Sequence, residues 1–242
     1  MKGEDIFNDA AKYNLWHDPH SKSGPGSNLT QTCIIREEIP KLLKKYNISS
    51  MVDAPCGDFF WIREIIPEMT KTLDTYLGID IAKELIKENT NRYTQDKVKF
   101  LQLDIIKQLI PKVDLVMTRD CFIHLSYRNI YKVLVNYKNS GAKYILLSTY
   151  TKPERRNYDC ADFFLHGRVL NMQKFPFFLD TPEFIINEGC TEWDGAYSDK
   201  SLALWELNKI NLTKISLNLK LAYILTPLAQ IENKLKRIIY LK

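Results

Sequence analysis

Three aspartates, Asp53, Asp80 and Asp104, each stand at the end of a short apolar run. Runs of this length are typical of buried strands, and the carboxyl ends of parallel strands lie along one edge of a sheet. Carboxylates at that edge can accept hydrogen bonds from the two hydroxyls of a ribose and from an adenine amino group. Each acid alone is more typical of a helix cap or a turn. The three in this order favour an adenosine-containing ligand.

The first apolar run leads into a tight turn, because residues 51–58 join two apolar residues to a proline, a glycine and a second acid. Gly57 has no Cβ, so its backbone can approach a ligand closely. Pro55 and Phe59 stand where a dinucleotide-binding motif carries its outer glycines. The turn therefore argues against a pyrophosphate site and leaves a smaller ligand without phosphate. An ordinary strand–helix turn capped by Asp58 is the alternative.

A second set of reactive side chains follows the apolar run 113–118. Asp120 and His124 are four residues apart, a spacing that puts both on one side of a helical turn. Either one is a candidate general base for a nucleophilic hydroxyl. In the alternative interpretation Asp120 is a helix cap and His124 its hydrogen-bond partner. Arg119 is a candidate for holding a cofactor carboxylate or an anionic substrate.

The elements that would position these residues alternate between strand and helix patterns. This predicts an α/β fold: a Rossmann-like, seven-stranded, mostly parallel sheet with helices on both faces and an antiparallel hairpin at its end. Thr32 is expected to cap the helix that precedes the first strand. The predicted strands are 50–54, 75–80, 98–103, 113–118, 143–150, 184–187 and 202–207, and the predicted helices are 30–46, 58–68, 82–92 and 127–140.

Residues 151–182 show little periodicity and follow a strand end. Long loops in compact domains are usually functional, so this stretch is predicted to face the substrate. An Ω-loop or an extra helix packed for stability is the alternative. The candidate substrate-binding residues are Tyr150, Asn157, Asp159, Arg168 and Asn171.

Charge divides the 242 residues unevenly. The whole chain carries a formal charge of +5, but residues 209–242 carry +6 and residues 1–208 carry −1. We therefore expect one near-neutral domain, residues 1–208, and a basic tail with helices at 217–225 and 227–240. A helix that lies on a membrane surface has this pattern, and so does a dimerisation or docking helix.

The motifs resemble those of the class I S-adenosylmethionine-dependent methyltransferases, and more narrowly a bacterial group linked to capsular and surface-polysaccharide biosynthesis. The likeness spans about residues 13–207, and it is carried by residues 23–27, 53–61, 78–80, 103–104, 119–126 and 199–205. It implies S-adenosylmethionine as cofactor and an N-terminal segment that folds over it. The cofactor-binding residues that it implies are Trp16, Gly26, Ser27, Asp53, Cys56, Gly57, Asp58, Trp61, Asp80, Ile81, Asp104, Ile105 and Arg119.

In that resemblance Asp53, Gly57 and Asp58 line the methionine end of the cofactor, Asp80 holds its ribose, and the pair 104–105 holds its adenine. The implied reaction is O-methylation of a sugar, sugar nucleotide or other polysaccharide precursor. One alternative is an N-methyltransferase that acts on a small-molecule amine or phosphoramidate precursor. Another is a non-catalytic cofactor-binding subunit that docks through its basic tail.

Several other functions are disfavoured by what the sequence contains. Base methylases carry Asp or Asn, two prolines and an aromatic residue after the fourth strand, whereas residues 119–122 read Arg-Asp-Cys-Phe, which argues against nucleic-acid bases as substrates. His17 and His20 lack a third ligand, and the five cysteines form no CxxC motif, so no metal site is predicted. We expect a cytoplasmic protein, either free or at the inner face of the membrane.

Overall fold

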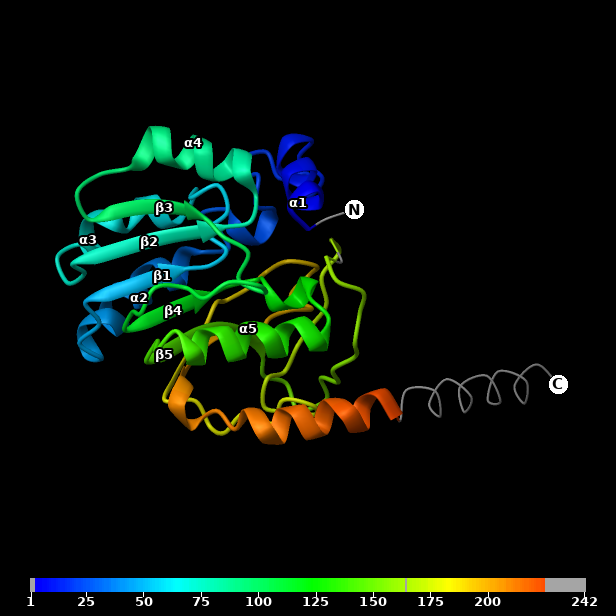
Figure 1. Cartoon of the computed structure of the whole chain (residues 1–242). Helices are drawn as coiled ribbons and strands as arrows, with labels where there is room; N and C mark the ends of the chain where they lie inside the picture. The colour runs from blue at the N-terminus through cyan, green and yellow to red at the C-terminus, as the bar shows by residue number, and fades with distance from the viewer. Residues whose placement is uncertain (1–2, 164, 225–242) are drawn as a thin grey trace.

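The sheet predicted from the sequence is present in the computed structural model, which describes residues 3–163 and 165–224. Its seven strands lie in the order β3-β2-β1-β4-β5-β7-β6; β1 to β5 are parallel, and β7 runs antiparallel to both β5 and β6 (Figure 1). The strands are β1 (Ser50–Asp53), β2 (Thr75–Asp80), β3 (Val98–Gln102), β4 (Leu115–Thr118), β5 (Tyr144–Tyr150), β6 (Phe184–Asn187) and β7 (Lys200–Glu206).

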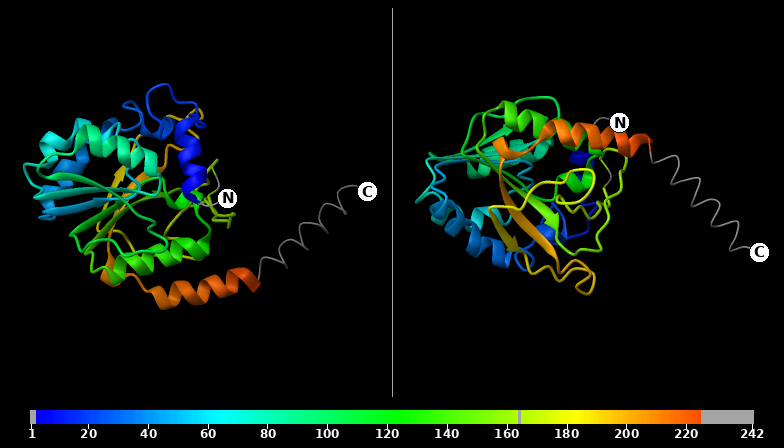
Figure 2. Two further views of the ribbon diagram at one scale, coloured as in Figure 1. Left: turned by 45° about the horizontal axis from the view of Figure 1, so that its top comes forward. Right: turned by 90° about the horizontal axis from the view of Figure 1, so that it is seen from below.

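Helices cover both faces of this sheet (Figure 2). The described helices are α1 (Gly3–Lys12), which packs against α4 (Lys83–Tyr93), and α2 (Cys33–Lys45), α3 (Ile66–Met69), α5 (Tyr127–Asn139) and residues 212–224. Short 3₁₀ turns lie at Pro25–Ser27, Ile62–Glu64, Phe122–His124 and Leu207–Lys209.

Strand β5 shows how the sheet separates two cores. Ile145 and Leu147 pack into the cluster that contains α5, whereas Tyr144 and Leu146 pack into the cluster that contains α2. Successive side chains of a strand point to opposite faces, so a strand buried on both faces must be apolar throughout. This is why the apolar residues of the central strands follow one another in the sequence and do not alternate with polar ones.

The chain order creates a switch point between β1 and β4. From β1 the chain moves outward through β2 to β3 and then returns to place β4 on the other side of β1. Asp53, the last residue of β1, pairs with Gly78 of β2 and with Met117 of β4. In open α/β sheets ligands bind outside the carboxyl ends of the strands at such a switch point.

Two local predictions are wrong. Residues 58–68 do not form one helix, because the segment divides into Ile62–Glu64 and the four-residue α3. Pro67 lies in the first turn of α3, where its missing N–H costs nothing. Thr32 occupies the N-cap position of α2, but the predicted side-chain cap is absent, since its hydroxyl donates to the carbonyl of Asn28 at 2.8 Å.

The C-terminal region begins its helix earlier than predicted, at residue 212 rather than 217. The side-chain oxygen of Asn211 accepts the amide proton of Lys214 at 2.9 Å, as an N-cap residue does. Ile215 and Leu219 pack into the same core cluster as α5. The predicted helix 227–240 lies outside the described residues. Within the described part of the chain, every helix is too short or too polar to cross a bilayer.

Candidate active site

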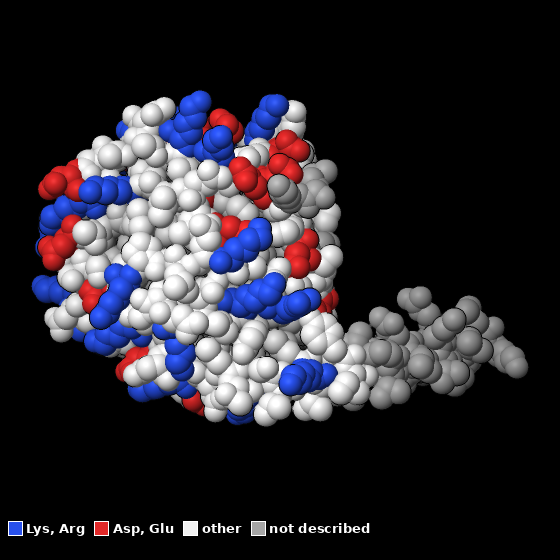
Figure 3. Space-filling view, in the orientation of Figure 1, with Lys and Arg blue, Asp and Glu red and all other residues white. Residues whose placement is uncertain are grey.

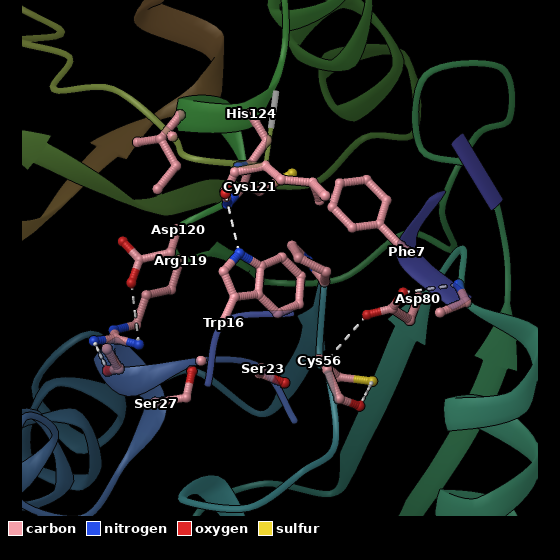
Figure 4. Close-up of a pocket in the computed structure, with 18 of the residues that line it drawn as sticks. Phe7, Trp16, Ser23, Ser27, Cys56, Asp80, Arg119, Asp120, Cys121 and His124 are labelled. Carbon is pink, nitrogen blue, oxygen red and sulfur yellow. Dashed lines mark hydrogen bonds and ion pairs between the residues drawn. The ribbon is translucent and has the colours of Figure 1, made fainter. Parts of the chain in front are cut away.

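A cavity of about 740 Å³ lies at the carboxyl edge of the sheet, at the switch point (Figure 4). A volume of this size suits a small-molecule ligand. All thirteen predicted cofactor-binding residues line it, from Trp16 in the N-terminal segment to Arg119 after β4. So do both residues predicted to be catalytic, Asp120 and His124.

Asp53 places a carboxyl group in this cavity from the end of β1. Its side chain is 3% exposed and accepts a hydrogen bond of 2.6 Å from the hydroxyl of Tyr76. Burial raises the pKa of Asp53 to about 7, because the charged form is poorly solvated there, and Asp80 adds repulsion. A cationic ligand in the cavity would favour the ionised form.

Asp80 joins the end of β2 to the turn after β1. Its two oxygens accept the amide protons of Gly57 at 3.0 Å and of Ala82 at 2.8 Å. Burial nevertheless raises the pKa of Asp80 above its ordinary value. The carboxylate is thus fixed in orientation by backbone donors, with further lone pairs that can accept from a ligand.

The third acid is less enclosed. The carboxylate of Asp104 accepts the amide proton of Ile106 at 3.0 Å and pairs with Lys107 at 2.7 Å. Its neighbour Ile105 also lines the cavity and packs against the core cluster of α5. The end of β3 therefore supplies one polar and one apolar wall.

Asp58 holds residues 21–27, called the N-terminal loop below, over the cavity. Its carboxylate accepts from the hydroxyls of Ser21, at 3.1 Å, and Ser23, at 2.9 Å, and from the amide of Lys22 at 2.7 Å. Five residues before Ser21, the indole N–H of Trp16 donates to the carbonyl of Leu165 at 3.0 Å. Asp58 thus joins the turn after β1 to the loop above it.

A buried group of charges lies beside the turn after β4. The carboxylate of Asp120 pairs with Lys200 at 2.6 Å and with Arg119 at 3.4 Å, and Arg119 also pairs with Glu188 at 2.6 Å. Burial alone would raise the pKa of Asp120, but the two cations hold it below the ordinary value. Arg119 additionally donates to the carbonyl of Gly26 at 2.7 Å, which ties the N-terminal loop to this group.

This arrangement argues against Asp120 as the base, because a carboxylate whose pKa is lowered by two cations accepts a proton poorly. Nor does Asp120 lie on the helical turn that the sequence predicted. Its φ is 51°, and a 3₁₀ turn starts at Phe122. The capping interpretation is also wrong, since Ser126 is the N-cap residue of α5.

His124 lies among aromatic side chains, as Figure 4 shows for the labelled rings. Its ring centroid is 6.1 Å from that of Phe7 and 6.2 Å from that of Trp16. Phe7 in turn contacts Phe163 edge to face at 5.9 Å. Of the two residues predicted to be catalytic, His124 is the better candidate base.

The predicted substrate residues separate into two groups. Tyr150 and Arg168 line the cavity. The other three hold the irregular loop together and do not line the cavity. Asn157 donates to two backbone carbonyls, Asp159 accepts from the amide of Tyr127 at 2.7 Å, and Asn171 accepts from the amide of Gln173 at 2.9 Å.

Lys200 is the site residue that the sequence interpretation missed. It starts β7, its side chain is 4% exposed, and it lines the cavity through its pairing with Asp120. The predicted strand began at residue 202, two residues after Lys200. Residues 199–205 carried part of the family resemblance, but nothing in that resemblance gave Lys200 a role in the site. Among the described residues, no group of three His, Cys, Asp or Glu side chains is arranged to hold a metal.

Solved structures resemble this architecture at low sequence identity. A methyltransferase from Leishmania major superposes with a TM-score of 0.59 at 14% identity over 83% of each chain. Human N-acetylserotonin methyltransferase, solved with S-adenosylmethionine, gives 0.58 at 11% identity over 84% of this chain and 59% of that one. The methyltransferase domain of bacterial CtHen1 gives 0.54 at 13% identity over 74% of this chain and 98% of that domain. This chain has the fold of the S-adenosylmethionine-dependent methyltransferases.

No protein-family model matches the sequence, and no curated protein matches it either. The methyltransferases that share the fold act on different classes of acceptor, because one fold hosts many functions. The activity of this chain must therefore be argued from its own cavity.

Proposed function

We propose that this chain is an S-adenosylmethionine-dependent methyltransferase. The observation that supports it most directly is the set of acids at the ends of β1, β2 and β3, which line one cavity at the switch point of a methyltransferase fold. Asp53 would lie at the methionine end, Asp80 would accept from the ribose hydroxyls, and Asp104 with Ile105 would hold the adenine.

The carboxylates that line the cavity fit this cofactor. S-adenosylmethionine presents a cationic sulfur and an ammonium group at one end and hydroxyl and amino donors at the other, and acceptor-only carboxylates complement all of them. When bound, it would supply a methyl group on a positively charged sulfur that a nucleophile can displace. The residues of this chain would orient the two reactants, exclude water with the N-terminal loop, and remove the proton of the acceptor.

The acceptor that we propose is a hydroxyl of a sugar or another precursor of a surface polysaccharide. A hydroxyl nucleophile requires a base, and we assign this role to His124, which lines the cavity. Asp120, kept ionised by Lys200, would act as a fixed negative charge. Tyr150 and Arg168 would contact the acceptor. The polysaccharide class rests on the sequence resemblance.

The test is transfer of a labelled methyl group from S-adenosylmethionine to a panel of sugars and sugar nucleotides. We expect labelled product with the parent chain and, because the base is lost, a decrease of at least about tenfold in kcat for His124→Ala. Cofactor affinity should change little in that variant. Label found on an amine and not on a hydroxyl would contradict the O-methyltransferase assignment.

A control variant addresses the base itself. Asp120→Asn keeps the shape of the side chain but removes the charge that pairs with Lys200. If Asp120→Asn abolished turnover while His124→Ala left kcat unchanged, the assignment of His124 as the base would be wrong.

A further inference from the structure

The helix of residues 212–224 exposes an apolar stripe that the core does not use. Leu217, Leu221 and Ile224 are 56%, 50% and 64% exposed, and their spacing places them on one face of the helix. Ile215 and Leu219 face the other way and are buried. Three large aliphatic side chains on one solvent-facing side are unusual in a globular helix, whose outer face is normally polar.

Lysines border this apolar stripe on both sides. Lys214 is three residues before Leu217, while Lys220 is three residues after Leu217 and four before Ile224. Both lysines are exposed. Residues 207–231 contain no aspartate or glutamate. In Figure 3 the surface around the end of this helix is mostly uncharged, and both blue and red side chains lie above it.

Two exposed aromatic rings extend the surface beside the helix. Phe175 and Phe178 are 37% and 42% exposed and contact each other edge to face at 6.0 Å. The side-chain amide of Asn218 donates to the carbonyl of Pro176 at 2.9 Å, and Lys214 lies 5.6 Å above the ring of Phe178. The aromatic loop is therefore fixed against the helix rather than free in solution.

From these features we infer that the helix of residues 212–224 docks this protein on an anionic lipid surface. Aliphatic side chains would enter the boundary between headgroups and acyl chains, and the bordering lysines would lie among the lipid phosphates. The formal charge of residues 209–242, which is +6 with Lys214 and Lys220 included, favours the same attraction. The body of the protein, at −1, offers no comparable attraction.

The charges favour lipid over the two other occupants. A second copy packed across the same face would bring lysines against lysines with no acid on either helix to pair with them. The lysines could bind the phosphates of a nucleic acid, but the three aliphatic side chains at the centre of the face would contribute nothing to that binding. A membrane surface uses both the lysines and the aliphatic residues.

The experiment is flotation of the full chain with vesicles of phosphatidylcholine alone or of phosphatidylcholine mixed with phosphatidylglycerol. We expect flotation with the anionic vesicles only, weakened by high salt. The double variant Leu217→Ser/Leu221→Ser should bind at least about tenfold more weakly, because it loses two aliphatic insertions. These side chains are exposed, so the unfolding midpoint should not change.

Leu109→Ser is the matched control. Leu109 is 55% exposed and lies on the loop between β3 and β4, so its loss should leave flotation unchanged. The inference is overturned if the parent does not float with anionic vesicles, or if the double variant floats as well as the parent. It is also overturned if the parent is a dimer in sedimentation and the double variant a monomer, since the face would then be a contact between copies.

Discussion

Asp53 shows how a single buried carboxyl group makes the stability of this fold depend on pH. Its ionised form is opposed mainly by burial and also by Asp80, and it is favoured by the hydroxyl of Tyr76 and by the positive charge of Arg119. The pKa is raised to about 7 in the folded state, against about 4 in an unfolded chain. The folded state therefore binds the proton more tightly, and the contribution of Asp53 to stability decreases as the pH rises from about 4 through about 7.

Replacing Asp53 by Asn removes this titration while keeping an acceptor for Tyr76. The parent should lose on the order of 2 kcal/mol of its free energy of unfolding between about pH 5 and about pH 8 as Asp53 ionises, and Asp53→Asn should not show this loss. Denaturant unfolding at the two pH values measures it. Asp114→Asn is the control, because serine donors lower the pKa of Asp114 despite its partial burial, and this variant should still show the loss. Absence of the loss in both variants would contradict the role of burial at Asp53.

At the same scale, the sequence located the acids of the site but not their partners. Asp53, Asp80 and Asp104 were predictable because each ends an apolar run in the sequence; Asp53 and Asp80 are the last residues of β1 and β2, and Asp104 follows the end of β3 by two residues. Lys200 and Glu188 were not predictable, because their pairing with Asp120 and Arg119 depends on β7 lying beside β5, far along the chain. Polarity alone made Asn157 a substrate candidate, whereas its side chain satisfies loop carbonyls.

At the scale of elements, the N-terminal loop and the turn after β1 act as one unit. Gly57 has a φ of +55°, and a Cβ added there would clash with the hydroxyl oxygen of Ser23. The hydroxyl of Ser23 also accepts the amide proton of Asp58 at 3.0 Å. The loop can therefore close over the cavity only if the turn carries no side chain at residue 57.

Gly57→Ala should release this loop. The methyl group would displace Ser23, so the loop should open and trypsin should cleave after Lys22 faster than in the parent. Gly195→Ala is the control, since Gly195 has a φ of +77° but no atom within 4 Å of the added Cβ. Both variants carry a similar backbone strain of about 1–2 kcal/mol, and only the first has the clash. Equal cleavage rates in the two variants would show that the loop does not depend on this contact.

Most helices and strands could be predicted because their sequence patterns have clear ends, whereas the segment 58–68 is divided internally. The central strands are continuous apolar runs, and the helices α4 and α5 have helical periodicity and clear ends, such as Gly141 after α5. The segment 58–68 has helical spacing, but the tight turn and Pro67 divide it into short pieces, and periodicity does not register that division. The irregular stretch 151–182 was predicted as such, while its contacts required the folded chain.

At the scale of the whole molecule, one cavity draws its walls from segments spread over the sequence. The sheet order brings the end of β1 beside the turn after β4, the N-terminal loop covers them, and β7 contributes Lys200. The helix of residues 212–224 packs beside α5, where the ammonium group of Lys138 donates to the carbonyl of Ile210 at 2.9 Å. Binding of a small ligand and contact with a lipid surface would thus use different parts of the molecule.

Calorimetric titration of S-adenosylhomocysteine into the parent chain and into Asp80→Ala tests the central claim most directly. We predict saturable binding at one site in the parent and affinity at least about tenfold lower in the variant, because the acceptor of the ribose hydroxyls is lost. Leu109→Ser should bind as the parent does. Absence of binding in the parent, or equal affinity in the parent and in Asp80→Ala, would contradict the assignment of this cavity to the methyl donor.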